Sequence, residues 1–102
     1  MLSEENKKRC ERIIAYYGYR PQLGMVIEEC SELIQAVAKV LRRCPCEVNM
    51  PYAINTENLK EEIADVAAML EQARQMAGMS EDQIDRRVAA KLDKVIARFG
   101  HD

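Results

Sequence analysis

Apolar residues recur at three- and four-residue steps along most of this sequence, and this period limits the fold more than any other feature. It is the spacing of the buried face of an amphipathic helix. Pro21 suits the first turn of such a helix, so we predict a long helix over residues 21–43. Its expected buried stripe is Leu23, Val26, Ile27, Cys30, Leu33, Ile34, Val37 and Leu41.

Three further stretches show the same period, and each has signals for its ends. Ser3 and Gly18 bound the first helix, Thr56 and Gly78 the third, and a Ser80–Gln83 capping box and Gly100 the fourth. Prolines interrupt the stretch from Cys44 to Asn55, which we expect to be a connection. We therefore predict one all-α domain over residues 1–102, a four-helix bundle-like fold. Helices this long leave apolar flanks that a homodimer or homotetramer would cover.

Composition excludes several classes of function. The chain has 102 residues and a net charge of −2, which gives no basic surface for nucleic acid or an anionic membrane. No apolar run approaches the roughly 20 residues that span a bilayer. The polar stretch 1–8 lacks the apolar segment of a signal peptide. With four cysteines that we expect to be reduced, we predict a cytoplasmic protein.

Two acidic runs suggest a site for a cation. Glu28, Glu29 and Glu32 lie on the second predicted helix, and Glu62 and Asp65 on the third. Carboxylates one turn apart share a side of a helix and repel one another. Apolar residues flank both runs, so we expect this side to face another helix or a cleft. Because no histidine lies nearby, the donors are all oxygen, which suits Mg²⁺ or Mn²⁺ and phosphate chemistry rather than zinc.

Several sequence features have alternative interpretations. The acidic runs could be a solvated face neutralised by Lys39 or Lys60. Cys44-Pro-Cys46 could be a redox pair or half of a zinc site, although no second ligand pair accompanies it. The aromatic corner at residues 16–19, with three tyrosines, is expected to seal the end of the bundle; stacking against a ligand is the alternative.

The two acidic runs and their surroundings resemble the MazG-like, all-α nucleoside triphosphate pyrophosphohydrolases. The resemblance covers both central helices and extends more weakly to the fourth. It is carried by Gln22-Leu23, Glu28-Glu29-x-x-Glu32, Glu32-Leu33-Ile34-Gln35-Ala36, Glu61-Glu62-Ile63-Ala64-Asp65-Val66, Lys91-Leu92-Asp93 and Arg98-Phe99.

This resemblance implies an activity and a set of roles. A nucleoside triphosphate, NTP or dNTP, would be hydrolysed to the monophosphate and pyrophosphate, in a site completed by a neighbouring subunit. A relative acting on phosphoribosyl-ATP or a pyrimidine deoxynucleotide is an alternative, as is a non-enzymatic dimerisation module whose acidic face binds a basic partner. The implied roles are Mg²⁺ or Mn²⁺ ligation by Glu29, Glu32, Glu62 and Asp65, catalysis with Glu28, and substrate binding by Gln22, Lys91 and Arg98.

Overall fold

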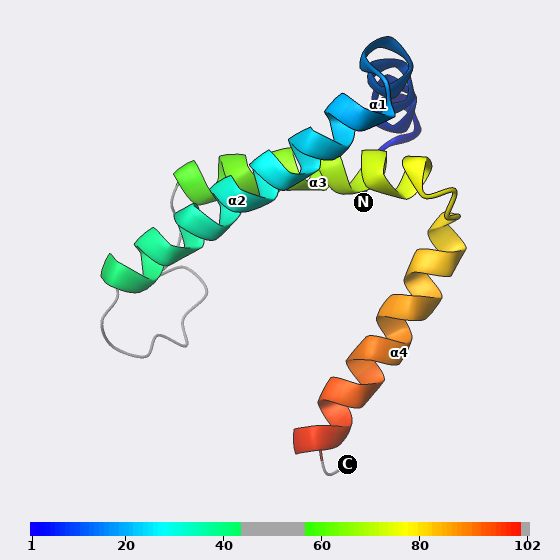
Figure 1. The fold of residues 1–102 in the computed structure, drawn as a ribbon. Helices are drawn as coiled ribbons and strands as arrows, with labels where there is room; N and C mark the ends of the chain where they lie inside the picture. Colours follow the sequence, from blue (N-terminus) through cyan, green and yellow to red (C-terminus); the bar gives the residue numbers. More distant parts are fainter. Residues whose placement is uncertain (44–56, 101–102) are drawn as a thin grey trace.

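The computed structural model describes residues 1–43 and 57–100, and these form helices only. Their bounds are α1 (Glu4–Tyr17), α2 (Tyr19–Arg43), α3 (Glu57–Met76) and α4 (Glu81–Phe99) (Figure 1). The predicted all-α class with four helices is confirmed. The predicted connection from Cys44 to Asn55, its Cys44-Pro-Cys46 pair and the Thr56 cap lie outside the described residues.

The helix ends follow local chemistry. Before α4, Ser80 and Gln83 form the predicted reciprocal capping box. Gly18 and Gly78 lie at φ 92° and 69°, in the left-handed region that suits glycine. The second helix begins at Tyr19, two residues earlier than predicted. Pro21 is tolerated there because the N–H groups of a first turn have no intrahelical partner.

Helices α2 and α3 run antiparallel and form the main contact of the chain (Figure 1). The Gln22 side chain at the start of α2 bonds to Gln72 near the end of α3. Seven residues along α2 from Gln22 is Glu29, and seven residues back along α3 from Gln72 is Asp65, which lies close to Glu29. The two helices therefore keep a constant register over these two turns.

We call the contact between these helices the α2–α3 seam. Its α2 side carries Gln22, Glu29, Glu32 and the buried Ala36, spaced by seven, three and four residues. This is the heptad spacing of a coiled-coil seam, occupied here mainly by polar side chains. Its α3 side carries Glu62, Asp65, Met69 and Gln72.

The apolar stripe predicted to be buried on α2 is largely exposed, so that prediction was wrong for the single chain. Ile27, Ile34 and Leu41 are 74%, 68% and 68% exposed. The reason is that α3 covers the neighbouring, more polar face of α2, and one helix cannot cover both. On α3 the predicted stripe residues Ile63 and Leu70 are also exposed. The buried apolar residues are Cys10, Ile14, Ala36, Val66 and Met69.

The fourth helix projects away from the other three (Figure 1). None of its residues is buried, and its stripe residues Leu92 and Phe99 are exposed. An ion pair of 2.5 Å between Lys7 and Glu81 ties its first turn to α1. The radius of gyration is 16.5 Å, whereas a compact domain of this length has about 13 Å. None of the described helices is both long and apolar enough to cross a membrane.

Candidate metal centre

Four carboxylates converge at the middle of the α2–α3 seam. Glu29 and Glu32 come from α2, and Glu62 and Asp65 from α3. Each offers an oxygen, and these oxygens all lie within 4.8 Å of one another. The structure thus brings together the four side chains for which metal ligation was predicted. We call this group the acidic cluster.

The acidic cluster carries charge that the described protein does not neutralise. Glu29 Oε2 and Glu62 Oε2 are shielded from solvent and have no hydrogen-bond partner among residues 1–43 and 57–100. Burial first, then the neighbouring carboxylates of Glu32 and Asp65, raise the pKa of both Glu29 and Glu62. Among the described residues no lysine or arginine forms an ion pair with the cluster, and Lys60 instead pairs with Glu57 at 3.5 Å.

This arrangement fits a hard divalent cation. All four donors are carboxylates, which Mg²⁺ and Mn²⁺ prefer to nitrogen or sulfur. A bound cation would give the two orphaned oxygens a partner and would relieve the repulsion that raises the pKa of Glu29 and Glu62.

The other predicted site residues lie outside the acidic cluster. Glu28 precedes Glu29 and is exposed on α2. Lys91 and Arg98 are exposed on α4, which projects away from the seam (Figure 1). Gln22 lies in the seam, but its side chain is buried and its amide nitrogen donates to Gln72 Oε1 at 2.7 Å. Its role in substrate binding remains a prediction.

Two turns from the acidic cluster lies a second polar group, which sequence reasoning missed. We call it the polar junction. It combines the Gln22–Gln72 bond across the seam with the neighbouring Glu71, Arg74 and Gln75 of α3, which bond among themselves. Arg74 binds both carboxylate oxygens of Glu71, at 3.1 and 2.5 Å, and this lowers the pKa of Glu71. Gln75 donates to Glu71 and to the Lys7 carbonyl oxygen, which fastens α1 to α3. The seven-residue steps from Glu29 to Gln22 and from Asp65 to Gln72 could have located Gln72.

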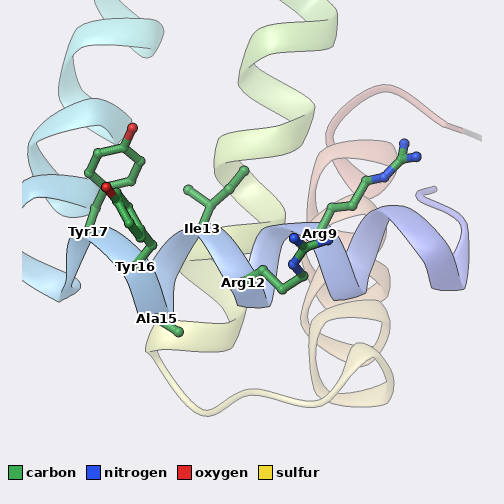
Figure 2. Close-up of a pocket in the computed structure, with 6 residues that line it drawn as sticks. All are labelled: Arg9, Arg12, Ile13, Ala15, Tyr16 and Tyr17. Carbon is green, nitrogen blue, oxygen red and sulfur yellow. The ribbon is translucent and has the colours of Figure 1, made fainter.

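A shallow hollow of about 680 Å³ lies along α1 and is separate from both polar groups (Figure 2). All six lining residues belong to α1, among them Arg12, Tyr16 and Tyr17, and no cluster carboxylate reaches it. The two tyrosine rings meet edge to face with centroids 4.8 Å apart. Tyr16 and Tyr17 are 82% and 59% exposed, so the predicted seal of the bundle end does not form in the single chain.

Comparison with known protein families agrees with this geometry. The MazG nucleotide pyrophosphohydrolase domain matches residues 20–101, a range that contains α3, α4 and all but the first residue of α2. Both halves of the acidic cluster therefore lie inside the matched region. No curated protein and no solved structure gives a significant match to the chain.

Proposed function

Because the chain belongs to the MazG nucleotide pyrophosphohydrolase family, we propose that it hydrolyses a nucleoside triphosphate, NTP or dNTP, to the monophosphate and pyrophosphate. The reaction depends on Mg²⁺, which Mn²⁺ can replace. The observation that carries this proposal is the acidic cluster, in which Glu29 and Glu62 each keep a buried oxygen without a partner in the described part of the chain.

Apart from Gln22, whose side chain is buried and bonded to Gln72, each predicted site residue has a part in this proposal. Glu29, Glu32, Glu62 and Asp65 hold the cation, which would offset the charge of the triphosphate and polarise its phosphorus–oxygen bonds. Glu28 lies beside them on α2 and orients the attacking water. Water adds to the α-phosphorus, the α–β anhydride bond breaks, and pyrophosphate leaves. Lys91 and Arg98 bind the phosphate oxygens.

We further propose that the working protein is a homodimer or homotetramer in which α4 of one copy serves the acidic cluster of another. The exposed stripe through Ile27, Ile34 and Leu41 supports this, since an apolar face of that extent is unfavourable in water. The direction of α4 supports it too, because Lys91 and Arg98 lie on a helix that leaves its own seam. We expect a cytoplasmic location, where the free thiols of Cys10 and Cys30 stay reduced.

Pyrophosphate release from a panel of NTPs and dNTPs, with Mg²⁺, Mn²⁺ or EDTA, tests the activity. We expect turnover with at least one nucleotide and either cation, and none with EDTA. Phosphoribosyl-ATP belongs in the panel as the alternative substrate. If no nucleotide is hydrolysed and neither cation shifts the melting temperature, the chain is a helical dimerisation module instead.

Mixing two inactive variants tests whether sites are shared between copies. Lys91→Ala keeps the acidic cluster, and Glu62→Gln keeps α4. If α4 acts on another copy, a mixed oligomer contains some sites in which both parts are intact, and activity returns on mixing. If α4 acts on its own chain, every site has one defect and the mixture stays inactive.

A further inference from the structure

We propose that Gln22 and Gln72 are positioning residues that set the register of α2 against α3 and so bring the four carboxylates together. This inference rests on the proposed function in one respect: it takes the acidic cluster to be the cation site. The two amides are not part of the acidic cluster. They act from two helical turns away, through the rigid helices that carry the carboxylates.

The geometry links the two groups directly. Gln22 precedes Glu29 by seven residues on α2, and Gln72 follows Asp65 by seven residues on α3, about 10 Å along each helix. A slip of α2 past α3 by one turn would move each carboxylate by about 5.4 Å relative to the facing helix. The ligand oxygens now lie within 4.8 Å of one another, so such a slip would open the cluster.

The remaining seam residues specify this register poorly. The acidic cluster opposes it, because without a cation its like charges favour separation. Met69 and the partly buried Met25 lie between the two polar groups, and methionine side chains adapt to shifted neighbours. Ala36, beyond the cluster, is too small to interlock with α3.

The Gln22–Gln72 hydrogen bond does specify the register. It is 2.7 Å long, and the two residues are only 6% and 3% exposed. Water therefore cannot replace the partner that either amide would lose in a slipped pairing, and buried unpaired amides are unfavourable. The preceding turn of α3 is also held to α1, since the Cys10 thiol donates to the Ala68 carbonyl oxygen at 3.7 Å. A single buried polar contact of this kind is known to set register in coiled coils.

The test separates register from stability by replacing both amides with leucine. Gln22→Leu with Gln72→Leu removes the hydrogen bond without leaving an unpaired amide, and leucine has a similar volume. We expect full helical circular dichroism and unchanged or higher resistance to urea. Mn²⁺ affinity, measured by electron paramagnetic resonance without nucleotide, should fall about 10–100-fold, as when an outer-shell partner is lost. The matched control is Met25→Leu with Met69→Leu, which should keep wild-type affinity.

Wild-type Mn²⁺ affinity in the folded double variant would overturn the inference. If that variant loses its helical signal, Gln22→Asn takes its place, because it keeps an amide that is one methylene too short to reach. Lower affinity with full helix content then supports the inference, and unchanged affinity overturns it.

A second measurement reports the register of α2 against α3 without a cation, so it tests the inference independently of the proposed activity. The register places Met25 and Met69 at one level of the seam, so we expect a nuclear Overhauser contact between their methyl groups in the metal-free protein. The contact should weaken in the double leucine variant, and an unchanged contact would overturn the inference. Failure of the proposed function would appear separately, as absence of pyrophosphate release from the wild type.

Discussion

Two polar groups along α3, the polar junction and the acidic cluster, differ in how their charges are satisfied. In the polar junction, Arg74 and Gln75 bind the buried carboxylate of Glu71, and the pKa of Glu71 falls. In the acidic cluster, buried oxygens of Glu29 and Glu62 lack partners among the described residues, and the pKa values of both rise. One group is therefore completed by side chains of α3 itself, whereas the described residues leave the other without a neutralising partner.

The largest effect should come from removing a ligand of the acidic cluster. Glu32→Gln or Asp65→Asn replaces a charged donor by a neutral one, and we expect turnover to fall by more than about 100-fold, beyond the loss typical of an outer-shell partner. Helical circular dichroism should be unchanged, because no internal ion pair is broken. Glu61→Gln is the control, an exposed acid on the same helix. Full activity in either ligand variant would show that the cluster is not the cation site.

Breaking the polar junction should instead lower the stability of the folded protein. Arg74→Ala leaves the Glu71 side chain, only 7% exposed, without its cation, and we expect a loss of about 3 kcal/mol in the free energy of unfolding in urea. Glu57→Ala removes the partner of Lys60 in an exposed pair and should cost less than about 1 kcal/mol. Equal losses in the two variants would mean that the junction is no more important than the surface.

The smallest effect is a pH dependence of the metal-free protein. Raised pKa values mean that folded Glu29 and Glu62 bind protons more tightly than unfolded ones, so this contribution to stability falls as pH rises from 4.5 through the raised values. Glu71 acts in the reverse sense, because its lowered pKa contributes stability above 4.5 that is lost toward acid.

Melting temperatures in EDTA, compared between the wild type and Glu29→Gln with Glu62→Gln, isolate the cluster. We expect the variant to have the higher melting temperature, by a difference that widens from pH 4 toward pH 8. Mg²⁺ should raise the melting temperature of the wild type only. A margin that does not change with pH would contradict the assigned origin of the raised pKa values.

Local signals in the sequence were sufficient to predict that the helices form. Gly18, Gly78 and the Ser80–Gln83 box mark the helix ends because each acts through its own backbone or that of a near neighbour. The expectation that the acidic runs face another helix also holds, because flanking apolar residues such as Ala36 report burial of that side.

The packing of the helices against one another could not be predicted from the sequence in the same way. Periodicity identifies an apolar face of a helix, but it does not identify the neighbour that covers this face. In this structure α3 packs against the more polar side of α2. Glu71 looks like an ordinary polar helix residue, and the contacts around it reach a distant segment, since Gln75 binds Glu71 and also bonds to the Lys7 carbonyl oxygen. For Gln72, which bonds to Gln22, the seven-residue steps from the acidic runs are the one available signal. The direction of α4 depends on a short turn and on the Lys7–Glu81 pair, neither of which leaves a periodic signature.

The capping of α4 has a consequence for how this helix forms. Starting a helix in water is unfavourable, and helices of this length are marginal when isolated. The Ser80–Gln83 box, Glu81 and Asp82 in the first turn, and Arg98 in the last all favour α4 without any tertiary neighbour. Nucleation is therefore assisted within the helix itself. A partner surface would meet α4 already ordered, and association would lose correspondingly less conformational entropy.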